Sequence, residues 1–414
     1  MKTNFTPAQL ENPALQEADG ILRACVHCGF CTATCPTYVL TGDERDSPRG
    51  RIYMIQEMLE KGGTPPPETV HHVDRCLSCL ACMTTCPSGV HFAHLVDQAR
   101  VHIETHHKRP LYDRLLRAML ANILARPERM RLALRLANFA RPFAKWLGPQ
   151  LQAMLTLAPA KLPAPQDFTG EHAATQKKMR VALLTGCAQS VLDPEINAAT
   201  IRLLTRLGVE VVVPQGAGCC GSLAHHVGRE DEAARLARAN VKAWQDAKVD
   251  HVVINTSGCG TTVKDYAHAI GEMPLSVLDV SELLALLDLP ALPPKSIKVA
   301  YHSACSLQHG QKLKTEPQAL LTRAGFTLTP IAESHMCCGS AGTYNILQPE
   351  MALQLGTRKR ANILRGRPDV IAAGNIGCLT QIALGLNVPV LHSIELLDWA
   401  YGGPKPSKIK GFGK

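Results

Sequence analysis

Short apolar runs alternate with longer amphipathic stretches over the second half of this chain. The apolar runs occupy 181–185, 251–255, 297–302 and 370–373, and stretches with helical periodicity occupy 231–247 and 349–364. Strand-length runs that alternate with helices are typical of α/β units with a mostly parallel sheet. The pattern therefore predicts an α/β architecture for this half.

The first half of the chain shows helical periodicity. Ser47 and Pro48 precede apolar residues at positions 52, 55, 58 and 59, which predicts a helix that is capped by the serine. Leucine and methionine recur at helical spacing between 108 and 147, where prolines divide the segment. Residues 148–178 are rich in alanine, proline and polar residues, so we expect a linker there.

The second half also contains an internal repeat, which is marked by its cysteines. Three pairs of positions are separated by 118, 118 and 119 residues: Cys187 and Cys305, Cys219 and Cys337, and Cys259 and Cys378. The sequence Cys-Cys-Gly-Ser occurs at the middle position of both copies. Because the carboxyl ends of parallel strands meet at one edge of a sheet, we expect these cysteines to gather there.

These patterns predict an α+β multidomain protein. We expect an α-helical, ferredoxin-like two-cluster domain followed by two tandem α/β repeats with parallel sheets. The expected divisions are a cluster domain at 1–107, basic amphipathic helices at 108–147, a linker at 148–178, repeat 1 at 179–290 and repeat 2 at 296–402.

Two copies of Cys-x-x-Cys-x-x-Cys-x-x-x-Cys-Pro supply the main chemical signal of the first half. This is the spacing of bacterial ferredoxins with two [4Fe–4S] clusters, in which the fourth cysteine of each run ligates the other cluster. The spacing predicts Cys25, Cys28, Cys31 and Cys86 as ligands of one cluster, and Cys76, Cys79, Cys82 and Cys35 as ligands of the second. Zinc is the alternative metal, although zinc sites commonly use two separated Cys-x-x-Cys pairs.

The eight remaining cysteines form a second candidate metal set. They are Cys187, Cys219, Cys220 and Cys259 in the first copy, and Cys305, Cys337, Cys338 and Cys378 in the second. Four thiols that converge at strand ends suit a further iron–sulfur centre or zinc, in each copy or shared between them. Buried thiols without metal are the alternative. A glycine after each adjacent pair allows a positive φ and close backbone approach.

Charge and composition restrict the kinds of molecule that this protein is expected to bind. The chain has 414 residues, 16 cysteines, a formal net charge of +9 and only 4% aromatic residues. Few aromatic side chains and no recognised nucleic-acid motif argue against a nucleic-acid partner. No apolar run is long enough to span a membrane, and the first 20 residues contain no apolar signal segment, so we expect a cytoplasmic protein.

The segment 108–147 is strongly basic, with ten Lys or Arg residues against two acidic residues. Basic charge combined with leucine spacing is consistent with peripheral contact on the cytoplasmic face of the inner membrane, near quinone. A solvated face, or a surface for an acidic partner subunit, explains the charge equally well.

Longer sequence motifs resemble a known family. The motifs are Arg-Ala-Cys-Val-His-Cys-Gly-Phe-Cys-Thr-Ala-Thr-Cys-Pro-Thr-Tyr at 23–38, Pro-Arg-Gly-Arg-Ile-Tyr at 48–53, Gly-Cys-Ala-Gln at 186–189 and Ser-His-Met-Cys-Cys-Gly-Ser-Ala-Gly-Thr-Tyr at 334–344. With them, almost the whole chain resembles the iron–sulfur subunits of bacterial glycolate oxidases (glycolate dehydrogenases). The repeats resemble the cysteine-rich CCG domains of heterodisulfide reductases and lactate-utilisation proteins.

The resemblance implies an electron-transfer subunit with two [4Fe–4S] clusters and no catalytic residue of its own. Partner subunits that contain FAD would oxidise glycolate to glyoxylate, with D-lactate as a second substrate. An acceptor such as quinone would receive the electrons. The CCG motif of that family ends in Cys-x-x-Cys, whereas this chain has Thr256 and Asn375 at the first of those positions. A subunit with thiol or metal chemistry in the repeats, like that of heterodisulfide reductase, is the alternative function.

Overall fold

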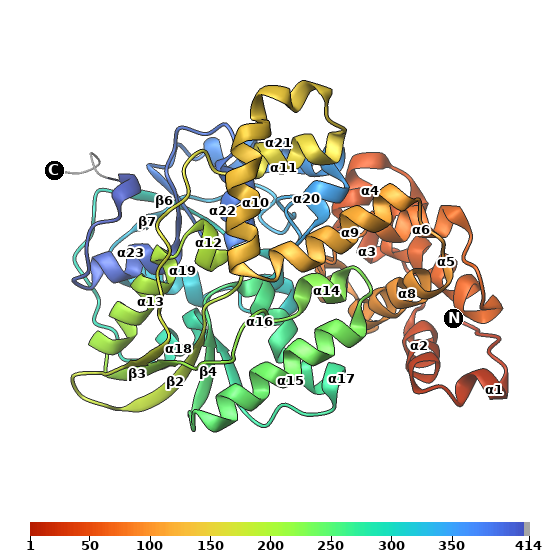
Figure 1. The fold of residues 1–414 in the computed structure, drawn as a ribbon, viewed down its shortest axis with the longest axis horizontal. Helices are drawn as coiled ribbons and strands as arrows, with labels where there is room; N and C mark the ends of the chain where they lie inside the picture. The colour runs from red at the N-terminus through yellow and green to blue at the C-terminus, as the bar shows by residue number, and fades with distance from the viewer. Residues whose placement is uncertain (410–414) are drawn as a thin grey trace.

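A computed structural model describes residues 1–409, which form a helical N-terminal part, a bridging set of helices and two α/β repeats (Figure 1). The predicted fold class is confirmed, because helices carry the first half and two largely parallel sheets form the second. No helix of residues 1–409 is both long and apolar enough to cross a membrane.

The N-terminal part is built from four longer helices with the cysteine runs between them. These are α2 (Pro13–Ala24), α5 (Pro48–Lys61), α6 (Pro67–Asp74) and α8 (Phe92–His106). Ser47 caps α5 as predicted, because its side chain accepts a hydrogen bond from the backbone N–H of Gly50 at 3.0 Å. Ile55, Val73 and Leu95 meet in the core between these helices, which fixes the cysteine loops at their ends.

Repeat 1 contains a five-stranded sheet in the order β1-β3-β2-β4-β5. Its strands are β1 (Gly170–His172), β2 (Met179–Leu184), β3 (Val209–Val213), β4 (His251–Ile254) and β5 (Ser276–Asp279). All neighbours are parallel except β1, which pairs antiparallel with β3. The parallel strands therefore end at one edge, where the cysteine loops follow.

Repeat 2 contains an all-parallel sheet in the order β7-β6-β8-β9. Its strands are β6 (Lys298–His302), β7 (Thr327–Leu328), β8 (Val370–Ala373) and β9 (Val390–His392). Both repeats contribute to the largest apolar cluster, which includes Val181 and Val253 of one sheet and Val299 and Ile371 of the other. The repeats are therefore packed against each other through a shared core.

Helices also connect the two halves. They are α9 (Leu111–Leu124), α10 (Pro127–Ala140), the 3₁₀ helix η2 (Arg141–Trp146) and α11 (Pro149–Leu157). In Figure 1 they lie between the orange N-terminal part and the blue repeat 2. Met154 and Leu157 pack with Leu116, Leu120 and Ile346, which anchors these helices to repeat 2. Arg117 of α9 forms an ion pair with Asp74 of α6 at 3.0 Å, which anchors them to the N-terminal part.

The segment 148–178, for which we predicted a linker, differs from that prediction. It contains α11 and the edge strand β1. Pro149 occupies the first turn of α11, where a missing backbone N–H costs nothing, so this proline starts a helix here. The later prolines of the segment follow the helix.

Candidate metal centres

Five of the N-terminal cysteines line one pocket. Cys25, Cys28, Cys31 and Cys86 line it together with Cys82, so the structure joins three sulfurs of the first run to the last cysteine of the second. The pKa of Cys31 is raised to about 11, chiefly by burial and also by the charges of neighbouring thiols including Cys25 and Cys86. Four converging thiols are the donor set of a [4Fe–4S] cluster, so these residues fit that group.

The other four N-terminal cysteines form a second group. Burial raises the pKa of Cys79 and Cys82 well above the usual value, and the charges of Cys76 and Cys35 raise both further. Ser78 donates its backbone N–H to the sulfur of Cys76 at 3.5 Å. The second run thus lies beside the last cysteine of the first run, and this group also fits a [4Fe–4S] cluster.

The backbone explains why each run can wrap around one point. His27 and Gly29 in the first run, and Ser78 and Leu80 in the second, all have positive φ, at the same places in the two runs. These left-handed residues turn each loop back on itself before the short helices α3 (Phe30–Ala33) and α7 (Ala81–Thr85) begin. Hydroxyl groups of Thr34 and Thr85 meet at 3.2 Å and join the two runs.

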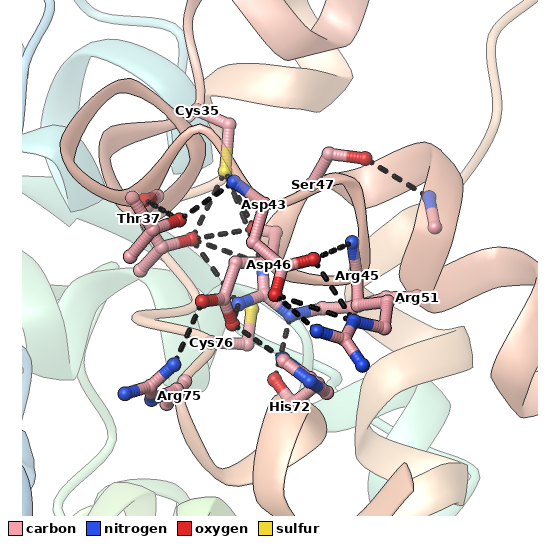
Figure 2. Close-up of polar contacts among 12 residues, drawn as sticks. Cys35, Thr37, Asp43, Arg45, Asp46, Ser47, Arg51, His72, Arg75 and Cys76 are labelled. Carbon is pink, nitrogen blue, oxygen red and sulfur yellow. Dashed lines mark hydrogen bonds and ion pairs between the residues drawn. The ribbon is translucent and has the colours of Figure 1, made fainter. Parts of the chain in front are cut away.

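A buried ion-pair network supports the second group, as Figure 2 shows. Asp46 is fully buried and is contacted by three cationic or ionisable side chains: Arg51 at 3.3 Å, His72 at 2.8 Å and Arg75 at 2.9 Å. The guanidinium of Arg51 donates to the carbonyl of His72 at 2.7 Å and lies 3.9 Å from the sulfur of Cys35. Its side chain is 1% exposed, so a positive charge is held in the protein interior against the thiols.

The charge balance at Arg51 follows from its surroundings. Burial alone would lower the pKa of Arg51, but the charges of Cys76, Cys35 and Asp46 outweigh burial and leave the pKa raised. A buried cation is stable only where anions compensate it, and thiolates of a metal cluster supply such anions. Asp46 and Arg51 were not among the site residues predicted from the sequence. The available signal was an arginine between the apolar positions of the helix that starts at Pro48.

The eight cysteines of the repeats line one central cavity of about 270 Å³. In each repeat, one cysteine follows β2 or β6, and an adjacent pair lies in the loop after β3 or β7. The fourth lies on the helix that follows β4 or β8, which is α16 (Ser257–Lys264) or α22 (Ile376–Ala383). Met130 and Leu134 of α10 and Met154 of α11 line the same cavity. The bridging helices therefore cover the strand ends with an apolar lid.

The glycine after each adjacent pair is required by the backbone. Gly221 and Gly339 have φ values of +84° and +88°. A Cβ atom at Gly339 would lie 2.6 Å from the carbonyl oxygen of Ala352. Each glycine donates its N–H to the first sulfur of the pair, at 3.5 Å to Cys219 and 3.4 Å to Cys337. The predicted close approach is therefore present in both repeats.

The thiols within each repeat contact one another. Hydrogen bonds from Cys187 and Cys220 lower the pKa of Cys219, while the same contacts raise the pKa of both donors. In repeat 2 the sulfurs of Cys305 and Cys337 are 3.6 Å apart. Such groups of buried thiols fit zinc or an iron–sulfur centre.

Repeat 2 also contains a buried histidine beside its thiols. One ring nitrogen of His302 and the sulfurs of Cys338 and Cys378 all lie within 4.8 Å of one another. Burial lowers the pKa of His302 well below the usual value, and the charge of Lys359 lowers it further. The imidazole is therefore neutral at physiological pH.

Arg51 gives a test of the second cysteine group. Replacing Arg51 with methionine removes a unit positive charge near the thiols. For a charge about 7 Å from the cluster and an effective dielectric constant of about 20, Coulomb's law predicts that the reduction potential of the cluster falls by roughly 100 mV. Redox titration followed by EPR should show this shift for one cluster only. The Arg51→Lys variant should shift it less.

The exposed Arg45, which pairs with Asp43 and Glu68, provides the matched control. Arg45→Met should leave both potentials unchanged. Equal potentials in wild type and Arg51→Met, with iron and sulfide contents intact, would contradict the assigned role of Arg51.

Comparisons with known proteins agree with this geometry. Residues 24–90 match the family model of the 4Fe-4S dicluster domain, and residues 181–264 and 299–383 each match that of the Cysteine-rich domain. These matches support iron–sulfur clusters as cofactors. A solved structure of a hypothetical protein from Helicobacter pylori has a TM-score of 0.53 at 10% identity, and the match covers 97% of this chain and 74% of that one. At that identity it shows the fold alone.

Full-length relatives define the family. The glycolate oxidase iron-sulfur subunit of Escherichia coli (strain K12) is 42% identical, over 97% of this chain and 99% of the relative. The probable glycolate oxidase iron-sulfur subunit of Bacillus subtilis (strain 168) is 30% identical over the same shares. With both cysteine runs and both repeats in the matched order, the chain belongs to the family of glycolate oxidase iron-sulfur subunits.

Proposed function

We propose that this chain is the electron-transfer subunit of a flavin-dependent complex that oxidises glycolate to glyoxylate, with D-lactate as a second substrate. The observation that carries the proposal is the pairing of three sulfurs from each cysteine run with one sulfur from the other run. Two [4Fe–4S] clusters bound there would pass single electrons from FAD of a partner subunit to an acceptor such as quinone.

The surroundings of the first cysteine group favour a docking surface for the flavin-containing partner. Cys28 is exposed, and exposed apolar side chains of Val26, Phe30 and Tyr53 lie beside it in sequence or in space. The ring of Tyr53 packs against that of His27, 4.4 Å away, inside the cysteine loop. Exposed aromatic groups beside a metal site are typical of protein interfaces. We therefore assign electron entry to this face.

The second cysteine group faces the repeats. Cys79 of the second run packs in one apolar cluster with Cys305 and Cys337 of repeat 2, so the thiols of the two parts lie close together. The hydroxyl of Thr84 and Nδ1 of His309 are 2.7 Å apart and join the two parts. This contact supports an electron path that runs from the exposed group to the buried group and on towards the central cavity.

The central cavity favours a second candidate function. Eight thiols line one cavity beneath an apolar lid, which suits metal or thiol chemistry on a small substrate, as in a subunit similar to that of heterodisulfide reductase. The absence of a Cys-x-x-Cys pair at Thr256 and Asn375 weighs against it. The relay function therefore has the stronger support, with the repeats holding a further iron–sulfur centre or zinc.

The bridging helices support peripheral contact with the cytoplasmic face of the inner membrane. Leu132, Leu136 and Phe139 share the outer face of α10, and Phe139 and Trp146 are 78% and 81% exposed. Exposed arginine and lysine residues flank them, namely Arg126, Arg129, Arg135 and Lys145. Exposed aromatic and aliphatic groups among basic residues fit the interface of an anionic membrane, where quinone is available.

Reconstitution with the flavoprotein tests the proposed function. The holo-complex should reduce an artificial electron acceptor when glycolate is added, and the Cys28→Ser variant should lose most of this activity because one cluster loses a ligand. The Cys378→Ser variant is the comparison for thiol chemistry in the repeats. The relay function predicts that dye reduction survives in it, whereas catalysis in the central cavity predicts that activity is lost. No glycolate-dependent reduction by the intact complex would refute the proposal.

Flotation with phosphatidylglycerol vesicles tests the membrane contact. The holoprotein should bind at low salt and dissociate as salt is raised. Replacing both Phe139 and Trp146 with serine should weaken binding at least about tenfold, because each aromatic side chain contributes on the order of 1.5–3 kcal/mol when buried. Leu353→Ser, at an exposed leucine outside the bridging helices, is the matched control and should bind as wild type. Equal binding by the double variant would exclude this surface.

A further inference from the structure

His302 at the end of β6 is a buried polar side chain without a partner. The residue is 1% exposed, and neither Nδ1 nor Nε2 has a hydrogen-bond partner within the part of the chain that the structure describes. Most buried polar atoms in folded proteins are paired, because an unpaired one loses its hydration without compensation. An imidazole with two unpaired nitrogens therefore needs an explanation.

The nearest candidate partners are thiols. Cys338 is fully buried, Cys378 is 2% exposed, and both sulfurs lie within 4.8 Å of each other and of a ring nitrogen of His302. Ligands of a tetrahedral zinc ion are roughly 3.5 Å apart, as bond lengths of about 2.0–2.3 Å require. The three donors would therefore need to close by at most about 1.3 Å around such an ion. The sulfur of Cys337 contacts that of Cys338 and offers a fourth donor, which lies outside the group of three and would have to move further to reach the ion.

Repeat 1 shows that packing does not require this histidine. Leu184 stands three residues before Cys187, just as His302 stands three residues before Cys305. Both end a central strand of their sheets, and Leu184 is 2% exposed in an apolar core. The same place in the fold is thus occupied by a leucine in repeat 1 and by a histidine, a residue that commonly binds metals, in repeat 2.

A second comparison between the repeats concerns the position at which the CCG motif has a further cysteine and this chain does not. Asn375 and Thr256 occupy equivalent positions, three residues before Cys378 and Cys259. In repeat 2 the amide of Asn375 donates to the sulfur of Cys378 at 3.5 Å, so Asn375 supports a thiol ligand without supplying one. A nitrogen donor from His302 adds a fourth ligand to Cys337, Cys338 and Cys378 in repeat 2, and repeat 1 has Leu184 at the matching place.

We propose that His302 is the nitrogen ligand of a metal ion held in repeat 2 by Cys337, Cys338 and Cys378, and that this Cys₃His set binds Zn²⁺. The inference rests on the metal binding that we propose for the repeat cysteines. On binding, the three thiol protons pass to solvent and the neutral imidazole binds through its lone pair. The ion would link the end of β6, the Cys337–Cys338 loop and α22 beside the cavity.

Metal analysis and zinc X-ray absorption on the full-length holoprotein test this assignment. Wild type should contain a zinc ion with three sulfur and one nitrogen ligand. The His302→Leu variant copies the residue of repeat 1 and should lose one zinc equivalent relative to wild type, while iron and sulfide in the N-terminal clusters are unchanged. His302→Cys should keep the zinc, and its ligand signature should change to four sulfurs.

His335 provides the matched control, because it lies two residues before Cys337 but outside the group of close donors. His335→Leu should keep the wild-type zinc content and spectrum. Unchanged zinc content and coordination in His302→Leu would overturn the role of His302 and leave the repeat cysteines as the metal site. A wild-type protein with intact N-terminal clusters and no zinc would overturn the zinc site itself, while the electron-transfer function would stand.

Discussion

The exchange of one cysteine between the two N-terminal runs is the constraint on which the rest of this structure depends. Cys86 completes the group of the first run, and Cys35 lies with the group of the second. Neither group can therefore assemble until α5, α6 and α8 have brought the two loops together. Because metal binding adds its free energy only to the folded arrangement, the helical core and the two proposed clusters stabilise each other.

The same arrangement gives the proposed electron path a direction, from an exposed cysteine group to a buried one. The first group opens to solvent at Cys28, and the second is enclosed by the Asp46–Arg51 network and by repeat 2. A buried arginine beside thiols is tolerated because its charge is balanced, and the same charge favours the reduced state of a bound cluster. Apolar packing of Leu77 and Cys79 against Tyr344 and Leu355 of repeat 2 then keeps the central cavity fixed relative to the second group.

Much of this organisation follows from sequence because cysteine spacing and strand–helix alternation are local signals. The two runs, the cap at Ser47, the repeat and the Cys-Cys-Gly turns all appear where the pattern predicts them. The failures concern tertiary context. The prolines of 148–178 suggested a linker, but Pro149 begins a helix whose apolar side packs across the cavity. Arg51 and His302 gained their roles only from neighbours distant in sequence, at Asp46, Cys35, Cys338 and Cys378.

EPR of the fully reduced, anaerobically prepared protein tests the central claim most directly, together with iron and acid-labile sulfide analysis. Two clusters held by exchanged cysteines lie close together, so their reduced spins should interact, and each chain should contain about eight iron and eight sulfide ions. Spectra of two independent clusters would contradict the interleaved arrangement. Stoichiometric zinc at the N-terminal cysteines, without inorganic sulfide, would contradict the account altogether.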